Sequence, residues 1–200
     1  MNAPATGAEA PPAQLPPGYP AELEGEAVLD DGTPIGFRPI RPDDAPALAE
    51  FHAGLSATSV YLRFFGAHPR LSEREVARFT HVDYHDRLAL VALVAGRLTG
   101  VARYDRLEGD EAEVAFVVAD DFQHHGIGTM LLERLADAAR RRGVATFFAQ
   151  TLAENRTMLD VFLHSGYAVT TTNDGQLVEL RFPIDHRVTR PPAHSGSEPC

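Results

Sequence analysis

Lysine is absent from this chain of 200 residues, in which all 18 basic residues are arginine. Tryptophan is absent as well, and the single cysteine, Cys200, is the last residue. One cysteine excludes an internal disulfide framework and a zinc site built on cysteines. The absence of lysine excludes a Walker-type phosphate loop, because that motif requires a lysine after its second glycine.

Long apolar runs and a net positive charge are also missing. The longest apolar run, residues 88–95, has eight residues, whereas a membrane-spanning helix needs about 20. The first residues, MNAPATGAEAPP, have neither the basic segment nor the apolar core of a secretory signal. The formal net charge of −10 argues against sequence-independent nucleic-acid binding, which requires a basic face. We therefore expect a soluble, cytoplasmic protein that binds neither nucleic acid nor a membrane.

Both ends of the chain lack the periodic apolar pattern that a packed core requires. The first 26 residues carry six of the 15 prolines, and the residues after 185 are equally poor in apolar side chains. Such segments cannot bury enough surface to offset the entropy lost on ordering. We predict disordered tails at residues 1–27 and 185–200, and one globular domain at residues 28–184.

Apolar periodicity and turn residues predict the order of elements within this domain. A strand begins near residue 36, and three helices follow it, the third with the Ser72–Glu75 spacing of a capping box. A hairpin and a third strand then precede a strand–helix–strand crossover and a final hairpin. This order predicts a mixed α/β fold, with a mostly antiparallel sheet of about six or seven strands and helices on both faces. The predicted helices are 44–54, 56–66, 71–82, 126–142 and 155–166, and the later strands are 88–107 as a hairpin, 112–119, 144–152, 167–172 and 177–183.

A glycine-containing loop, FQHHGIG, lies directly before the longest predicted helix. Helix N-termini bind anions because their first N–H groups have no partner within the helix. The dinucleotide fingerprint G-x-G-x-x-G fails here, since its third glycine is replaced by Leu131. The pattern Q-x-x-G-x-G is filled by Gln123, Gly126 and Gly128. Spacing alone leaves open a helix start that uses two glycines without any ligand.

This loop, together with the downstream segment NRTMLDVFLHSGY, is similar to the acetyl-coenzyme A-binding core of the GNAT acetyltransferases. The resemblance runs from about residue 37 to residue 182. The segments SVYLRFF, LSEREVARFTHVDY and AEVAFVVADDFQHHGIG further resemble the catalytic domain of the bacterial Pat-type protein lysine acetyltransferases. The resemblance implies the GNAT fold and an acetyl-coenzyme A-dependent N-acetyltransferase.

The resemblance also implies where acetyl-coenzyme A binds. Backbone N–H groups of the loop would hold the pyrophosphate, and the edge of the third strand would pair with the pantetheine arm. His125 stands where such loops often carry lysine or arginine. Asn155 would contact the coenzyme arm, although it is equally suited to cap its own helix. The implied coenzyme-binding residues are Val117, Val118, Ala119, Gln123, His124, His125, Gly126, Ile127, Gly128, Thr129 and Asn155.

A carboxylate is expected at the acceptor side, because a lysine amine attacks only after it loses its proton. Glu113 shares a face of the strand AEVAFVV with Ala115 and Val117, and charged residues are rare in central strands. The alternative is an ion pair with Arg103 or Arg106 across the hairpin. The match of AEVAF to the Pat-type enzymes favours Glu113 as the general base, with Glu111 as a fallback.

Two further positions bear on the chemistry. Many GNAT enzymes place a tyrosine, as acid for the leaving thiolate, where this chain has Phe162, so protonation by solvent becomes the alternative. The segment from Arg63 to Phe65 is expected to anchor the second helix, with the acceptor cleft as a second possibility. His81 and His85 have the spacing of metal ligands but lack the glutamate of H-E-x-x-H, and we predict no metal site.

We interpret the chain as an N-acetyltransferase that modifies a protein lysine by direct attack. The resemblance implies acyl- or acetyl-coenzyme A synthetases as targets. Pat-type enzymes often carry a fused regulatory domain, for which the predicted N-terminal tail is too short. Two alternatives remain open: transfer to a small-molecule amine, and a non-catalytic module that binds coenzyme A.

Overall fold

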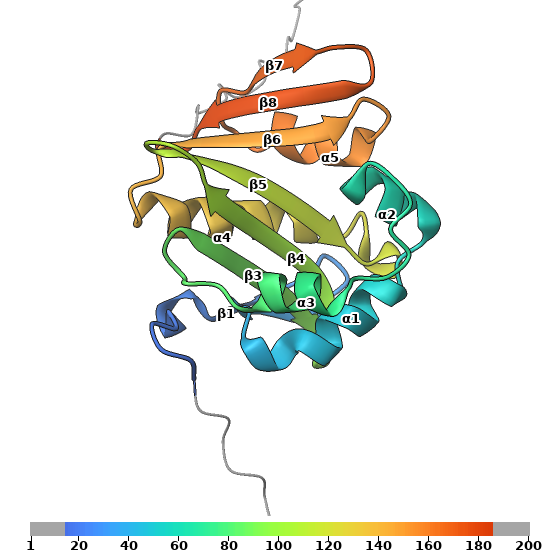
Figure 1. The fold of residues 1–200 in the computed structure, drawn as a ribbon, viewed down its shortest axis with the longest axis vertical. Helices are drawn as coiled ribbons and strands as arrows, with labels where there is room; N and C mark the ends of the chain where they lie inside the picture. The colour runs from blue at the N-terminus through green and yellow to red at the C-terminus, as the bar shows by residue number, and fades with distance from the viewer. Residues whose placement is uncertain (1–14, 186–200) are drawn as a thin grey trace, which may run out of the picture.

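The computed structural model describes residues 15–185 (Figure 1). The chain forms an eight-stranded sheet in the order β1-β2-β3-β4-β5-β6-β8-β7. The strands are β1 Gly25–Val28, β2 Pro34–Pro39, β3 Arg87–Val94, β4 Arg97–Arg106, β5 Glu111–Val118, β6 Thr146–Leu152, β7 Thr170–Asn173 and β8 Leu177–Pro183. The helices are α1 Ala45–Ala53, α2 Ala57–Phe64, α3 Glu73–Thr80, α4 Ile127–Arg140 and α5 Arg156–Leu163, with short 3₁₀ turns at Ala21–Leu23, Pro42–Asp44 and Asp120–Phe122.

The sheet is mixed, as predicted. All neighbouring strands are antiparallel except β5 and β6, which are parallel and joined by the crossover helix α4. The predicted hairpin, crossover and final hairpin are all present. The strand count of eight exceeds the six or seven expected, because β1 was not predicted.

Strand β1 lies within the segment that the sequence analysis assigned to the N-terminal tail. Its four residues pair with β2 in antiparallel register. Upstream, the Arg41 guanidinium donates hydrogen bonds to the Tyr19 hydroxyl at 3.0 Å and the Glu24 carboxylate at 2.7 Å. Strand β1 has only four residues, and its side chains alternate between half-buried and exposed. This alternation is too weak to be recognised in a proline-rich segment. Residues 1–14 and 186–200 of the predicted tails lie outside the described residues.

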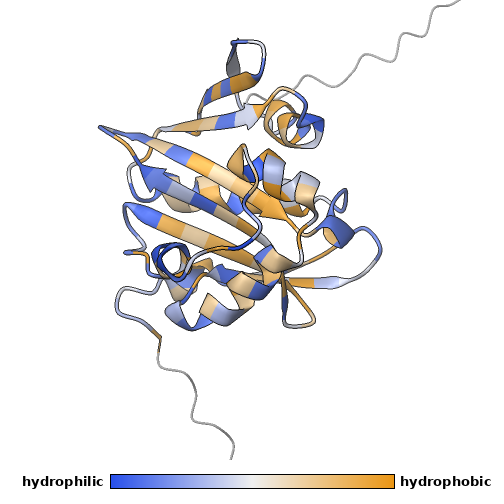
Figure 2. Ribbon diagram, turned by 45° about the vertical axis from the view of Figure 1, so that its right-hand side comes forward, coloured by the Kyte–Doolittle hydropathy of each residue, from blue (hydrophilic) through white to orange (hydrophobic). Residues whose placement is uncertain are grey.

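Two helical layers cover the sheet. Helices α4 and α5 cover one face, and α1, α2 and α3 cover the other. Figure 2 shows the hydrophobic residues concentrated in the central strands, and every side chain from Leu88 to Ala92 is fully buried. A strand buried on both faces reads as a continuous apolar run rather than an alternating one. None of the helices among the described residues is both long enough and apolar enough to cross a membrane.

Helix α4 holds the larger core together. Ile127, Leu131, Leu135 and Ala138 recur every three or four residues and are buried against β3, β4 and β5. Each fully buried leucine or isoleucine contributes about 1.5–3 kcal/mol relative to an exposed one. The helix is therefore fixed rigidly on the sheet, and so is the loop that precedes it.

Helices α2 and α3 each begin at a serine cap. The Ser56 hydroxyl accepts a hydrogen bond from the Ser59 N–H at the start of α2. Ser72 and Glu75 form the predicted capping box at the start of α3. Each such cap contributes about 1 kcal/mol. These caps fix where the two short helices begin above the sheet.

Candidate active site

Strands β5 and β6 separate after a short paired stretch. Their parallel pairing ends at Glu113 and Phe148. Beyond this point β5 continues to Val118 and β6 to Leu152, but the two strands no longer pair with each other. Figure 1 shows the two strands diverging from a common end. The separation leaves the β6-facing edge of β5 without a partner strand.

A cavity of about 490 Å³ occupies this separation. It extends from the open edge of β5 to the N-terminus of α4, and residues of α2, β6 and α5 complete its wall. This volume is within the range of small-molecule and cofactor sites. Its lining includes Ser59, Leu62 and Arg63 of α2, Val114–Val118 of β5, Gln123, His124 and Gly126–Thr129 of the loop and α4, Gln150 and Thr151 of β6, and Asn155, Met158, Val161 and Phe162 of α5 and its cap.

Main-chain groups on the open edge of β5 come from alternate residues. The Ala119 N–H donates to the Thr99 carbonyl at 2.8 Å, so Ala119 and Val117 direct their main-chain groups toward β4. Phe116 and Val118 therefore direct theirs toward the cavity. These donors and acceptors suit an extended amide chain, which would pair with them as an added strand does.

The N-terminus of α4 presents unpartnered N–H groups to the same cavity. Gly126 is the N-cap residue, and no side chain in the described part of the chain caps the helix. His124 and Gly126 both have left-handed backbone conformations, with φ of 65° and 77°, a geometry that glycine adopts without strain. A Cβ at Gly126 would enter open space among the described residues. The helix end can therefore accept an anion such as a pyrophosphate.

The Gln123 side chain binds the protein itself. Its Nε2 donates to the Val118 carbonyl on the open edge and to the Ser59 hydroxyl, both at 3.1 Å. Asp120 completes the connection, because its carboxylate accepts hydrogen bonds from the Ser56 N–H and from the hydroxyls of Ser56 and Ser59 at 2.6–2.8 Å. Burial opposes these bonds, yet their combined effect lowers the pKa of Asp120. The network fastens the start of α2 to the loop before α4.

Glu113 lies on the α2 face of β5 and directly precedes Val114, the first residue of this strand that lines the cavity. Its side chain is exposed and forms no ion pair or hydrogen bond with the residues that the structure describes. The alternative pairings are excluded within that part, since Arg103 stacks on Phe79 and Arg106 pairs with Asp86. The fallback residue, Glu111, pairs with Arg181. Glu113 is thus the carboxylate of β5 without an ion-pair or hydrogen-bond partner among the described residues.

The partner strand makes the position of Glu113 costly. Asp105 of β4 lies directly opposite it in the register, and like charges opposite each other destabilise a sheet. Arg87 offsets this cost by binding Asp105 at 2.8 Å. A carboxylate retained at such a place suggests a chemical role rather than a structural one.

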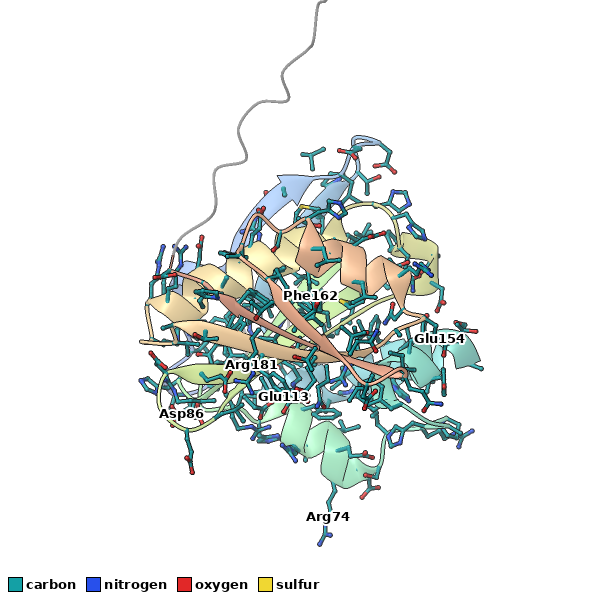
Figure 3. The ribbon with its side chains drawn as sticks, turned by 90° about the horizontal axis from the view of Figure 1, so that it is seen from above. Arg74, Asp86, Glu113, Glu154, Phe162 and Arg181 are labelled. Carbon is teal, nitrogen blue, oxygen red and sulfur yellow. The ribbon has the colours of Figure 1, made fainter. Side chains whose placement is uncertain are left out.

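Phe162 and Asn155 lie on the opposite wall, in the region of α5. Figure 3 shows Phe162 and Glu113 on opposite faces of the sheet. The Phe162 ring packs against Phe116 and Phe182 at centroid distances of 5.7 and 5.6 Å. It provides packing and no proton. The Asn155 side chain accepts a hydrogen bond from the Met158 N–H, so it caps α5 while it lines the cavity.

The structure brings most of the predicted coenzyme-binding residues to one cavity. Those that line it are Val117, Val118, Gln123, His124, Gly126, Ile127, Gly128, Thr129 and Asn155. Ala119, His125 and Glu113 are not part of this lining. The described residues contain no group of three metal-ligating side chains. Sequence reasoning did not select Ser59 or Asp120, and it placed Arg63 primarily as an anchor of α2.

Known proteins are similar to this chain in sequence. The model of the Acetyltransferase (GNAT) family matches residues 57–167. The Acetyltransferase PA5475 of Pseudomonas aeruginosa is 33% identical over 155 residues, which are 74% of this chain and 83% of that protein. The Acetyltransferase Pat of Mycolicibacterium smegmatis is 34% identical over 128 residues, or 61% of this chain and 38% of that protein.

A solved structure is similar over most of the described region. The GNAT domain of S. lividans PAT is 41% identical with a TM-score of 0.79, and the match covers 82% of this chain and 99% of that domain. The chain belongs to the GNAT family of acetyltransferases, acyltransferases that use acetyl-coenzyme A as co-substrate.

Proposed function

We propose that this enzyme transfers the acetyl group of acetyl-coenzyme A to a lysine side chain of a protein, with Glu113 as the general base. The observation that carries the proposal is the exposed carboxylate of Glu113, which is unpaired among the described residues and is next in sequence to Val114 of the cavity wall. The similarity to the GNAT domain of S. lividans PAT supports the choice of substrate class. We also propose a cytoplasmic location, where acetyl-coenzyme A is available.

The residues of this chain divide the work of the reaction. The N–H groups at the start of α4 would hold the pyrophosphate, and the main chain of Phe116 and Val118 would orient the arm. Acetyl-coenzyme A supplies an activated thioester. A lysine amine is neutral only about once in a thousand molecules at pH 7.4, which adds about 4 kcal/mol to the barrier. Glu113 lowers this barrier by accepting the amine proton, directly or through one water.

The departing thiolate receives its proton from solvent. Phe162 occupies the place that a tyrosine holds in many relatives, and its ring has no ionisable group. A thiol of pKa about 8.5 is a tolerable leaving group without a protein acid. We propose direct attack without a covalent enzyme intermediate, because residues 15–185 contain no cysteine that could act as the nucleophile.

The acceptor is proposed to be an acyl- or acetyl-coenzyme A synthetase. Exposure of Glu113 on the α2 face lets a lysine on a folded surface reach it. The net charge of −10 favours a lysine with basic neighbours, and this attraction should weaken above about 0.15 M salt, where the Debye length is about 8 Å.

The test compares two classes of acceptor under the same conditions. A purified acyl-coenzyme A synthetase, free lysine and a polyamine are each incubated with the enzyme and labelled acetyl-coenzyme A. We expect label and loss of activity on the synthetase and little transfer to the free amines. Because the enzyme has no lysine, label on its own side chains will not obscure the result. Equal or greater turnover of the free amines would favour a small-molecule acetyltransferase, and binding without any transfer would favour a non-catalytic module.

A further inference from the structure

Arg63 of α2 lines two neighbouring cavities. It lines the cavity of about 490 Å³ together with Val114–Val118. It also lines a smaller cavity of about 40 Å³ with Arg103, Ala115 and Val117. Arg63 therefore lies against the middle of β5, where its charge interacts with that of Glu113.

Among residues 15–185, no carboxylate pairs with the Arg63 guanidinium. Other half-buried arginines do: Arg38 binds Asp44 at 2.6 Å and Arg87 binds Asp105 at 2.8 Å. Within the described residues Arg63 has neither an ion pair nor a hydrogen bond, and its Cζ only approaches the Phe64 ring at 5.0 Å. A half-buried arginine whose charge contacts only an aromatic ring lacks the anionic partner that Arg38 and Arg87 have.

Neighbouring carboxylates do not satisfy this charge. Asp105 is already approached by Arg87 at 2.8 Å, Arg78 at 3.8 Å and Arg103 at 3.9 Å. Glu113 attracts Arg63 through space without contacting it. Burial lowers the pKa of Arg63, and the charges of Glu113 and Asp105 only partly oppose that shift. The cavity thus presents an unused cation next to the proposed base.

We propose that Arg63 binds a carboxylate carried into the cavity, and that the source is the far end of a dicarboxylic acyl group, so that succinyl-type thioesters of coenzyme A are donors besides acetyl-coenzyme A. A planar guanidinium binds a carboxylate through two parallel hydrogen bonds, and such pairs are strong where water is excluded. This inference rests on the proposed coenzyme site. The carboxylate that Arg63 binds could instead belong to the acceptor, next to the amine that is acylated.

The position of Arg63 favours the acyl source. The pyrophosphate site lies at the start of α4, and the edge groups of Val118 and Phe116 lead from it back along β5 toward Glu113. A pantetheine arm that pairs with this edge would place its acyl end near the middle of β5. Arg63 lines both cavities at this point. The coenzyme's own phosphates are held at the opposite end of the cavity.

The binding arm compares two thioesters of equal chain length by calorimetry on the full chain. Succinyl-coenzyme A and butyryl-coenzyme A share every phosphate and differ in the terminal carboxylate. We expect the wild-type enzyme to bind the succinyl compound about tenfold more tightly, and this ratio to fall to about one in Arg63→Met. The matched control is Arg74→Met, since Arg74 points into solvent in Figure 3 and should retain the wild-type ratio.

The acceptor arm uses acetyl-coenzyme A and two lysine peptides, one with aspartate and one with asparagine beside the lysine. A preference for the aspartate peptide that disappears in Arg63→Met, without a succinyl preference, would support carboxylate binding with the acceptor as its source. If neither arm shows a carboxylate preference that depends on Arg63, the inference is wrong.

Two controls separate failure of this inference from other failures. If Arg63→Met does not fold, Arg63→Lys keeps the charge and loses the two-pronged geometry, and its ratio should fall at least threefold. An unchanged ratio in Arg63→Lys would count against the inference. Loss of binding of every thioester by the wild-type enzyme would instead contradict the proposed function.

Discussion

The two faces of β5 differ in what they bury. On the α4 and α5 face, Ala112, Val114 and Phe116 are at most 5% exposed and pack into the larger core. On the α2 face, Glu111 and Glu113 are charged, and Val117 is only half-buried. The same strand thus contributes to stability through one set of alternate side chains and to the candidate chemistry through the other.

This difference suggests how the fold tolerates an active site on a central strand. The apolar face fixes the strand against α4, which also positions the helix N-terminus. The other face can then carry an unpaired carboxylate opposite Asp105 and an unpaired guanidinium at Arg63, arrangements that cost stability. Substitutions on the two faces should therefore have separable effects, on stability and on catalysis.

The largest effect on stability is expected from Phe116→Ala on the apolar face. This change removes a ring that packs on Phe162, and truncations of buried phenylalanine cost about 3–5 kcal/mol. Urea denaturation followed by circular dichroism measures the free energy of unfolding. The matched change on the other face, Val117→Ala, should cost about 1 kcal/mol, as expected for a half-buried side chain. Similar losses for both would remove the contrast between the faces.

A smaller effect is expected at the coenzyme end of the cavity, from Gly128→Leu. A Cβ at this glycine would already lie 3.4 Å from the Val161 side chain, so a larger side chain must project toward the cavity or displace α5. We expect affinity for acetyl-coenzyme A to fall at least 100-fold, or about 2.7 kcal/mol, as measured by calorimetry. Gly128→Ala makes only an ordinary contact and should lose much less. Unchanged affinity in Gly128→Leu would mean that the pyrophosphate does not approach this backbone.

The smallest effect concerns Asp120, which connects α2 to the loop. Asp120→Asn removes the charge from three hydrogen bonds to Ser56 and Ser59 and should cost about 1 kcal/mol of stability at pH 7. The pKa of Asp120 is lowered in the folded protein, so its contribution is present above the unfolded pKa of about 4 and is lost as pH falls through the folded value. Unfolding curves from pH 7 to pH 3 should show the wild type and the variant converging. A constant difference over this range would exclude a role for the charge.

Much of the fold was predictable because local signals agreed with it. The capping box at Ser72 and the glycines before α4 each mark a boundary that the structure confirms. The network of Asp120 was not predictable, since its partners lie more than 60 positions away and contact depends on the tertiary fold. Strand β1 was missed because it is short and exposed on alternate residues.

The open strand edge shows the limit of sequence reasoning in more detail. The motif predicted the segment Val117–Ala119, but the pairing of Ala119 with Thr99 determines which main-chain groups remain available. Which alternate residues direct their main-chain groups toward the open edge depends on the register of the strand with its neighbours. A single sequence does not specify that register. Arg63 illustrates the same limit, because its lack of an anionic partner becomes visible only when the surrounding side chains are in place.

The central claim is that Glu113 accepts the proton of the attacking amine, and the turnover of Glu113→Gln tests it most directly. We expect acetyl-coenzyme A affinity and stability close to wild type, with kcat lower by about 10²–10⁴ across pH 6–9. Glu154→Gln, an exposed carboxylate elsewhere on the surface (Figure 3), should keep wild-type turnover. Wild-type turnover of Glu113→Gln over this pH range would contradict the claim and assign the proton to Glu111 or to solvent.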